Sequence, residues 1–176
     1  LIPQIVAAVE AISGARSVLD LFSGTSRVGH ALKARGYRVL ANDHLAYAHV
    51  LARCYVEADR EEVERPAQQL LAELNQLRGA PGWFNGERID AIREAIARKE
   101  LPPDLEAVLL VSLMEAADRV DSTTGVQMAY LKSWAPRAHK DLLLRLPEVQ
   151  PRARAGKGRA YRLDAADAAR LRADVA

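Results

Sequence analysis

Residues 18–26, which read VLDLFSGTS, decide the fold of this chain. The run at 18–22 is short and mostly apolar, as expected of a buried parallel strand. The small residues at 23–26 predict a turn, and a helical pattern follows them. A second strand is predicted at 37–43 and a second helix at 44–57. Strand, glycine turn, helix, strand and helix make a βαβ unit, so we predict an α/β fold.

Composition places the chain among ordinary globular proteins. Its 176 residues are 49% hydrophobic and 27% charged, which argues against a disordered or fibrous chain and allows one domain with a substantial insertion. The net charge of +2 implies no strongly polyelectrolyte partner. The single cysteine, Cys54, excludes a disulfide framework and fits a reducing compartment. Since the sequence shows neither the roughly 20-residue apolar run of a membrane span nor a secretory signal, we expect a soluble, cytoplasmic protein without membrane contact.

The middle of the chain, from Asp59 to about Leu146, carries three amphipathic helical patterns and no strand pattern. Such a stretch is far longer than the crossover that a doubly wound sheet needs, so we interpret it as an insertion. Tyr161 to Asp164 then predicts a return to the sheet, followed by a short helix. We therefore predict a Rossmann-like sheet with a mainly helical insertion. The predicted divisions are residues 1–58, 59–150 and 151–176.

Three predicted strand ends carry residues that suit a nucleotide-type cofactor, because open parallel sheets bind ligands at the carboxyl ends of their strands. Gly24 follows the first strand and lets a ligand approach the backbone closely. Asp43 ends the second strand, at the distance of about 20 residues from which an acid accepts hydrogen bonds from ribose hydroxyls. Asp164 ends a third strand and would accept from an adenine amino group. The alternative is that Gly24 and Asp43 are only turn and cap residues.

NAD is the rival ligand, since its fingerprint G-x-G-x-x-G occupies the same turn. A fingerprint that includes Gly24 needs a further glycine at position 22 or 26, and this chain has Phe22 and Ser26 there. Phe22 lies directly before the turn, where an aromatic ring packs against an adenine or closes a small pocket. These residues favour S-adenosylmethionine over NAD.

Residues 19–56, LDLFSGTSRVGHALKARGYRVLANDHLAYAHVLARCYV, resemble the S-adenosylmethionine motif and the following acid of the N6-adenine DNA methyltransferases. The similarity continues through RIDAIREAI at 88–96, DRVDSTTGVQMAYLKSWAPR at 118–137 and YRLDAAD at 161–167. The resemblance implies a site-specific enzyme that transfers a methyl group from S-adenosylmethionine to an adenine flipped out of double-stranded DNA. The order of the segments resembles the subgroup whose target-recognition region precedes its catalytic motif. That order implies a target-recognition role for residues 59–150.

The resemblance also implies the residues of the cofactor site. In the family, Phe22, Gly24 and their neighbours line the methionine moiety, while Asp43 holds the ribose and Asp164 holds the adenine. Ser26 departs from the family pattern F-x-G-x-G, which usually has glycine at that position. Since serine is small, cofactor binding is expected to survive. The implied cofactor site comprises Asp20, Phe22, Ser23, Gly24, Thr25, Ser26, Asp43 and Asp164.

The family's catalytic motif, Asp-Pro-Pro-Tyr, does not occur in this sequence, so no catalytic residue is assigned. The Pro-Pro pair at 102–103 precedes a predicted helix and is not that motif. Residues 174–176 are typical of the start of a buried strand, and Leu1 lies inside an apolar helical pattern, so both ends look cut. In the family, the catalytic strand follows the segment that resembles YRLDAAD. We therefore expect the catalytic strand after Ala176.

The stretch from Arg137 to Arg162 contains eight Lys or Arg residues, and Asp141 and Glu148 alone oppose them along the chain. This surplus suits contacts with DNA phosphates, while a solvated basic loop would show the same pattern. Lys132 and Arg137 are the candidate nucleic-acid contacts.

The other candidate functional residues each have a structural explanation as well. Residues 122–125 either touch phosphates or bases, or cap the preceding helix. Trp83 and Trp134 serve either recognition or, as the simpler interpretation, core packing. The histidines show no metal-ligand spacing with Cys54, which is expected to be a packed thiol, so no metal is predicted.

Two other functions stay open from the sequence. A non-catalytic nucleic-acid-binding module would keep the methyltransferase fold without its chemistry. A methyltransferase that acts on RNA or on a small molecule would use the same cofactor site. For a DNA methyltransferase, the expected setting is a restriction-modification system with a cognate restriction endonuclease as partner.

Overall fold

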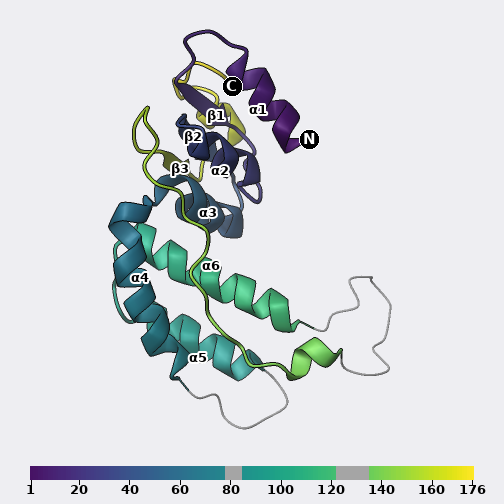
Figure 1. The fold of residues 1–176 in the computed structure, drawn as a ribbon, viewed down its shortest axis with the longest axis vertical. Coiled ribbons are helices and arrows are strands. Elements are labelled where there is room, and N and C mark those ends of the chain that lie inside the picture. The colour runs from purple at the N-terminus through teal and green to yellow at the C-terminus, as the bar shows by residue number, and fades with distance from the viewer. Residues whose placement is uncertain (78–84, 122–134) are drawn as a thin grey trace.

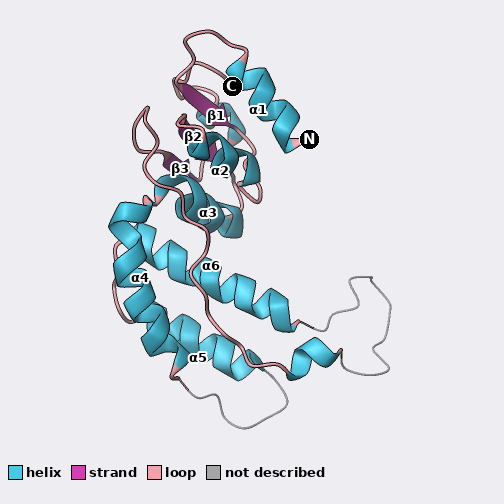
Figure 2. Ribbon diagram, in the orientation of Figure 1, coloured by secondary structure: helices cyan, strands magenta, loops and turns pink. Residues whose placement is uncertain are grey.

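The computed structural model describes residues 1–77, 85–121 and 135–176, which form an elongated molecule of two lobes (Figure 1). The sheet lobe contains α1 (Ile2–Glu10), β1 (Ser17–Asp20), α2 (Arg27–Ala34), β2 (Arg38–Asn42), α3 (Ala46–Ala52), η1 (Arg53–Glu57), β3 (Arg159–Tyr161) and α7 (Ala165–Ala168). The helical lobe contains α4 (Arg60–Asn75), α5 (Asn85–Ala97), α6 (Pro103–Val120) and η2 (Pro136–His139). Figure 2 shows the strands confined to the sheet lobe. The predictions of an α/β fold and of a helical insertion are confirmed for the described ranges.

The three strands form a parallel sheet in the order β1-β2-β3. Leu19 of β1 lies opposite Leu40 of β2. Val175 joins the other edge of β1 by a parallel bridge to Val18, as predicted for a strand that starts at 174–176. The chain thus moves outward from β1 to β3 and returns to the opposite edge of β1. Ligands of open parallel sheets bind at such a reversal of strand order, outside the carboxyl ends of the strands.

Helix α2 packs closely on the sheet because Gly29 has no side chain. A Cβ built at Gly29 would lie 2.8 Å from Val56 Cγ2 and 3.4 Å from Val39 Cγ1, so a larger residue would push the helix away. Val39 and Val56 belong to the core of the sheet lobe. The other buried members of this core are Val6, Val9, Val18, Leu32, Ala41 and Ala52.

The helix predicted at 44–57 is an α-helix only as far as Ala52, after which the chain continues as the π-helix η1. Cys54 and Tyr55 of η1 are buried in the core of the helical lobe, whereas Val56 is buried in the core of the sheet lobe. The wider π turn therefore directs neighbouring side chains into two different cores. Burial raises the pKa of the Cys54 thiol, and the predicted packed thiol is confirmed.

The helical lobe packs α4, α5 and α6 around a second apolar core. Residues 140–158, here called the return strap, run along these helices and lead back to β3 (Figure 1). Asn75 fixes the strap, since its Nδ2 donates to Leu144 O at 3.0 Å and its Oδ1 accepts from Leu144 N at 2.9 Å. Within the described ranges, no helix is both long enough and apolar enough to cross a membrane.

Candidate functional site

One buried amide, Asn42, holds the carboxyl ends of the three strands together. Its Nδ2 donates to Leu21 O at 3.2 Å and to Leu163 O at 3.3 Å, and its Oδ1 accepts from Leu163 N at 2.9 Å. Leu21 follows β1 and Leu163 follows β3, so a single side chain links all three strand ends. Sequence reasoning missed Asn42. The signal that could have identified Asn42 is a polar residue at the end of an apolar strand, because a buried amide without hydrogen-bond partners would be costly.

The predicted residues Gly24 and Asp43 come together at this edge of the sheet. Gly24 N donates to Asp43 Oδ2 at 2.9 Å, and Leu45 N donates to Asp43 Oδ1 at 2.9 Å. Asp43 therefore does fix two turns, as the alternative interpretation expected. Each carboxylate oxygen has a further lone pair, so the side chain can still accept hydrogen bonds from a ligand.

The backbone at Gly24 borders open space. Its φ is +48°, in the left-handed region, and a Cβ built there would have no heavy atom within 4 Å. A ligand can therefore approach this turn as closely as the backbone allows.

Asp20, the last residue of β1, has a carboxylate oxygen without a partner. Its Oδ2 is buried and has no hydrogen-bond donor among the described residues. Burial raises the pKa of Asp20, and the nearby charge of Asp43 raises it further. An unpaired buried acceptor costs about 1–3 kcal/mol, so folding alone does not favour a carboxylate at this position.

The turn from Ser23 to Ser26 connects β1 to α2. Ser23 N donates to Asn42 O at 2.9 Å, and Ser26 N donates to Ser23 O at 2.7 Å. Ser26 is buried and has a φ of +57°, a conformation that favours glycine. This backbone geometry explains why glycine is usual at this position in the pattern F-x-G-x-G. Thr25, the remaining predicted residue of the turn, is exposed.

Three exposed apolar side chains lie near Gly24 or Asp43 in the sequence, two of them in the turns and Tyr47 in the first turn of α3. Phe22 is 72% exposed, Leu45 is 50% exposed and Tyr47 is 52% exposed. Exposed apolar surface of this kind marks ligand or partner sites, and aromatic rings suit the flat face of a nucleobase. Phe22 was predicted from the sequence, whereas Leu45 and Tyr47 were not.

The third strand, β3, ends at Tyr161, so the predicted strand bounds of 161–164 were wrong; Asp164 lies three residues after it and is the N-cap of α7. Its Oδ1 accepts from Ala166 N at 2.9 Å. The side chain is exposed, and Oδ2 has no hydrogen bond with the described residues. Asn42 positions Asp164 through the neighbouring Leu163. One oxygen of Asp164 is therefore engaged in capping, and the other has no hydrogen-bond partner within the described ranges.

Of the two predicted nucleic-acid contacts, Arg137 can be placed. It is exposed in η2, and its Nε donates to the backbone oxygen of Asp121. Outside the described residues lie Lys132, Trp83, Trp134 and residues 122–125.

The basic run between residues 137 and 162 is less free than its sequence indicates. Arg152 Nε lies 2.5 Å from Asp59 Oδ2, and Lys157 Nζ lies 2.7 Å from Asp104 Oδ2. Burial opposes the charge of Lys157, but the carboxylates that accept from it raise its pKa to about 12. Both acids lie in the helical lobe, far from the run in the sequence. Acids outside the run therefore oppose it as well, in addition to Asp141 and Glu148 within it.

Comparisons with known proteins identify the family. A family model described as D12 class N6 adenine-specific DNA methyltransferase matches residues 1–175. Over 147 residues the chain is 33% identical to Type II methyltransferase M.NlaIII of Neisseria lactamica, covering 71% of this chain and 43% of that protein. Over 161 residues it is 30% identical to Type II methyltransferase M.FokI of Planomicrobium okeanokoites, covering 74% of this chain and 25% of that protein. No solved structure gives a significant match.

The chain spans less than half the length of these relatives, with 43% of M.NlaIII and 25% of M.FokI covered. The family match nevertheless extends over residues 1–175, from α1 to the bridge at Val175. The parallel sheet and its crossover helices are those of a Rossmann-like methyltransferase fold. This chain belongs to the D12 class of N6 adenine-specific DNA methyltransferases.

Proposed function

We propose that this chain forms the cofactor-binding and target-recognition part of a DNA adenine N6-methyltransferase, with S-adenosylmethionine bound at the strand ends. The observation that carries the proposal is the Gly24–Asp43 contact at the carboxyl edge, beside the buried, unpaired oxygen of Asp20. These groups match a nucleoside with a charged tail: an open backbone turn, a carboxylate for the ribose and an acceptor for an ammonium group.

Each side chain of the site has its own role in the proposal. Asp43 accepts from the ribose hydroxyls, and Asp20 accepts from the ammonium group of the methionine moiety. Phe22 and Gly24 line the methionine moiety, while the second oxygen of Asp164 accepts from the adenine amino group. The cofactor, when bound, supplies an electrophilic methyl group.

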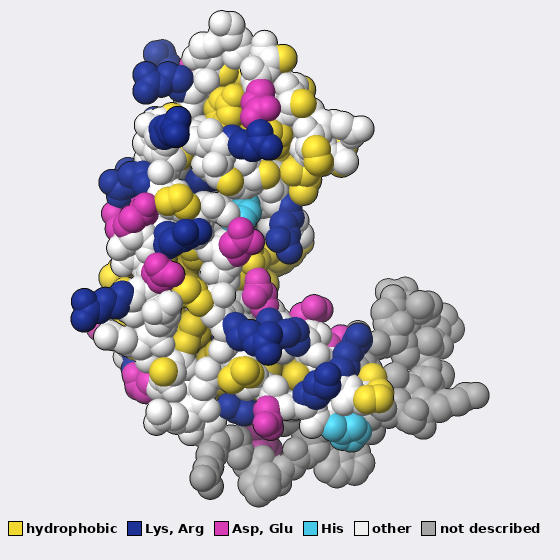
Figure 3. Space-filling view, viewed as in Figure 1, with side chains coloured by type: hydrophobic (Ala, Val, Ile, Leu, Met, Phe, Trp, Pro, Cys, Tyr) yellow, Lys and Arg dark blue, Asp and Glu magenta, His cyan; other side chains and the backbone are white. Residues whose placement is uncertain are grey.

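The helical lobe is proposed to hold double-stranded DNA, with Arg137 contacting a phosphate. The outline of the molecule is concave at one edge between the two lobes (Figure 3), and the duplex is proposed to lie there. The target adenine has to leave the stack, because its amino nitrogen cannot be reached inside the duplex. Alignment of that nitrogen with the methyl group then supplies much of the rate.

The catalytic groups are proposed to lie on a strand beside β1. Val175 enters the sheet there, with Leu19 N donating to Val175 O at 2.8 Å. A strand that continues from Val175 parallel to β1 ends beside the turn at Gly24, because parallel strands share their carboxyl edge. No catalytic residue is proposed among the 176 residues, which contain no Asp-Pro-Pro-Tyr.

The substitution Asp43→Ala in the full-length protein tests the cofactor site. It removes the two charge-assisted hydrogen bonds proposed between the Asp43 carboxylate and the ribose hydroxyls. Each is worth about 1.5–3 kcal/mol, so the affinity for S-adenosylmethionine should fall by about 100-fold or more. Asp90→Ala is the matched control, because this aspartate is 64% exposed on α5. Calorimetry measures both affinities. An unchanged affinity in Asp43→Ala would contradict the site assignment.

The acceptor is tested with labelled cofactor and two substrates, a DNA duplex and an RNA of the same sequence. We expect label on adenine N6 of the DNA alone. Labelled RNA would favour the RNA methyltransferase, and DNA binding without any methyl transfer would favour the non-catalytic module. Because the relatives above are named type II methyltransferases, we also propose a restriction-modification setting with a cognate endonuclease.

A further inference from the structure

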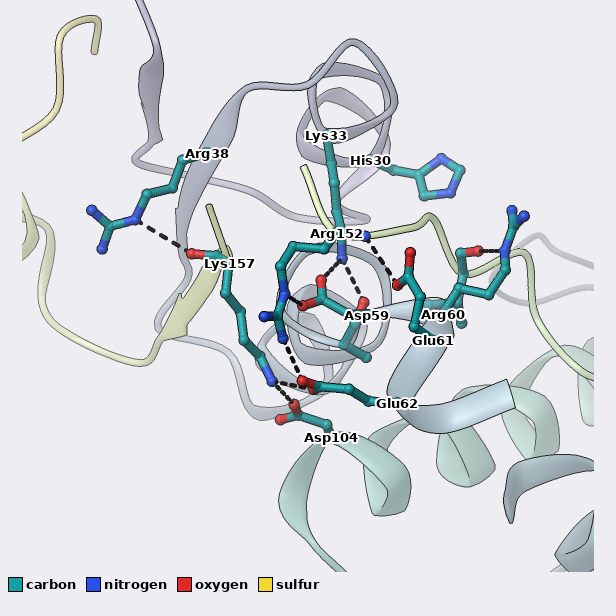
Figure 4. A network of polar contacts seen from close by, with 12 residues as sticks. His30, Lys33, Arg38, Asp59, Arg60, Glu61, Glu62, Asp104, Arg152 and Lys157 are labelled. Carbon is teal, nitrogen blue, oxygen red and sulfur yellow. Dashed lines mark hydrogen bonds and ion pairs between the residues drawn. The ribbon is translucent and has the colours of Figure 1, made fainter. Parts of the chain in front are cut away.

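A buried ion pair joins the two lobes (Figure 4). Lys33 lies on α2 in the sheet lobe, and Asp59 is the N-cap of α4 at the start of the helical lobe. The Nζ and Oδ1 atoms are 3.0 Å apart, and the two side chains are 1% and 0% exposed. Lys33 Nζ also donates to Ala58 O at 2.5 Å. Two charges are thus removed from water at the point where the chain passes from one lobe to the other.

The charges around this pair are divided between the helical lobe and the return strap (Figure 4). Arg152 Nε lies 2.5 Å from Asp59 Oδ2. Lys157 Nζ lies 2.8 Å from Glu62 Oε2 and 2.7 Å from Asp104 Oδ2. The carboxylates belong to the helical lobe, whereas the cations belong to α2 or to the return strap. The Lys33–Asp59 pair therefore joins α2 of the sheet lobe to the helical lobe, and the pairs of Arg152 and Lys157 hold the return strap against the same acids.

Stability alone does not account for a buried ion pair. Desolvation offsets much of the attraction between the charges, and well-packed apolar residues of similar volume often stabilise a protein as well or better. Burial accordingly lowers the pKa of Lys33. What these groups add is direction, because Lys33 Nζ donates to Ala58 O and Arg152 Nε donates to Asp59 Oδ2, and charged hydrogen bonds select a distance and an angle whereas apolar contacts are non-directional.

Helix α2 connects the ion pair to the cofactor turn. Ser26 of that turn is the N-cap of α2, and its O accepts from His30 N at 2.9 Å. Lys33 follows about two helical turns later, at a distance of roughly 10 Å along the axis. The strap that carries Arg152 continues into β3 and so to Asp164. A shift of the helical lobe against α2 would therefore move the cofactor edge relative to anything that the helical lobe holds.

We propose that Lys33 and Asp59 are positioning residues for methyl transfer, because their ion pair fixes the helical lobe, and the DNA that it holds, relative to the cofactor turn. This inference rests on the proposed function. A misplacement of the reacting groups by about 1 Å can reduce the rate about 100-fold while the substrates still bind. Loss of the ion pair should therefore lower kcat far more than it weakens the binding of cofactor or DNA.

The test compares Asp59→Asn, Lys33→Met and the double variant in the full-length protein. Asp59→Asn leaves the buried ammonium group of Lys33 without a counter-charge, and Lys33→Met leaves Asp59 with Arg152 as its remaining ion-pair partner among the described residues, so the activity of either single variant can fall through unfolding alone. The double variant removes both charges, and its urea midpoint should return close to that of the wild type. A positioning role predicts that this double variant has wild-type affinity for S-adenosylmethionine and a kcat about 10- to 100-fold lower.

The matched control is Glu73→Gln with Lys99→Met, an ion pair of 2.8 Å within the helical lobe, which should keep the wild-type kcat. A double variant of Lys33 and Asp59 with wild-type kcat would overturn the proposal. So would a loss of kcat that merely follows the folded fraction at the assay temperature. Cofactor affinity is measured first without DNA. A wild-type protein that binds no S-adenosylmethionine would contradict the proposed function and not the positioning role.

Discussion

At the scale of single residues, the cofactor turn contains groups that folding alone does not favour. Asp20 has a buried oxygen without a donor among the described residues, and Ser26 has a left-handed backbone. Unpaired buried polar groups and strained backbone concentrate at sites where ligand binding uses them. Each of these two residues allows a prediction.

The affinity for S-adenosylmethionine should fall in acid at a higher pH than an ordinary aspartate would produce. Burial, and then the charge of Asp43, raises the pKa of Asp20 above 3.8. The ammonium group prefers ionised Asp20, so the affinity is full above the raised pKa and is lost as the pH falls through it. Calorimetry between about pH 7 and pH 4 measures this loss. Asp20→Asn should bind more weakly at neutral pH and depend less on acid; an unaltered pH profile would rule out this role.

Ser26→Gly should make the protein more stable than Ser26→Ala does. Both substitutions remove the buried hydroxyl, but only glycine adopts a φ of +57° without a steric penalty. The penalty of the left-handed conformation for other residues is about 1–2 kcal/mol, so the two free energies of unfolding should differ by about that amount. Urea unfolding gives both values. Equal stabilities would mean that the turn relaxes to another conformation.

At the scale of the elements, two asparagine side chains link segments that are separate in the sequence. Asn42 connects the ends of β1, β2 and β3, and Asn75 connects α4 to the return strap. Both side chains bind backbone groups, yet only Asn42 lies next to the cofactor site. The two asparagines therefore form a natural pair for separating stability from binding.

Asn42→Ala should lower the free energy of unfolding by about 3 kcal/mol, because it removes three hydrogen bonds from partly buried carbonyl and amide groups of Leu21 and Leu163. It should also reduce the affinity for S-adenosylmethionine by about 10-fold, since Asp43 and Asp164 lose their support. Asn75→Ala is the control, expected to lower stability while leaving that affinity unchanged. Urea unfolding measures the stability of the two variants, and calorimetry measures their affinity for S-adenosylmethionine. Equal affinities would show that Asn42 only stabilises the sheet.

At the scale of the whole molecule, two apolar cores meet at η1 and the ion-pair network. Consecutive residues of η1 enter different cores, and Lys33, Asp59 and Arg152 connect the lobes beside it. The stability of the molecule should therefore respond unequally to the buried and the exposed members of this network.

Asp59→Asn should destabilise the protein by about 3–5 kcal/mol, because it leaves the ammonium group of Lys33 buried without a counter-charge. Glu62→Gln, at a side chain that is 45% exposed, should cost less than about 1 kcal/mol, since water screens its pairs with Arg152 and Lys157. Urea unfolding at one ionic strength compares the two. Comparable losses would show that Asp59 is solvated in solution.

The sequence by itself determined the βαβ unit, the helical insertion and the positions of Gly24, Asp43 and Asp164 at strand ends. These features depend on periodicity and on small residues at turns, which are local properties of a chain. The break of the second helix into η1 was not predictable, because the π turn satisfies two cores formed by distant segments.

Only the tertiary structure decided which polar groups meet. Asn42 bonds Leu163, a residue 121 positions away, and Arg152 pairs with Asp59, a residue 93 positions away. The tertiary structure also decided that Arg152 and Lys157 face acids instead of forming a free basic loop. Hydrogen bonds and ion pairs depend on distances of about 3 Å in space, and those distances are set by packing, which the order of residues along the chain does not display.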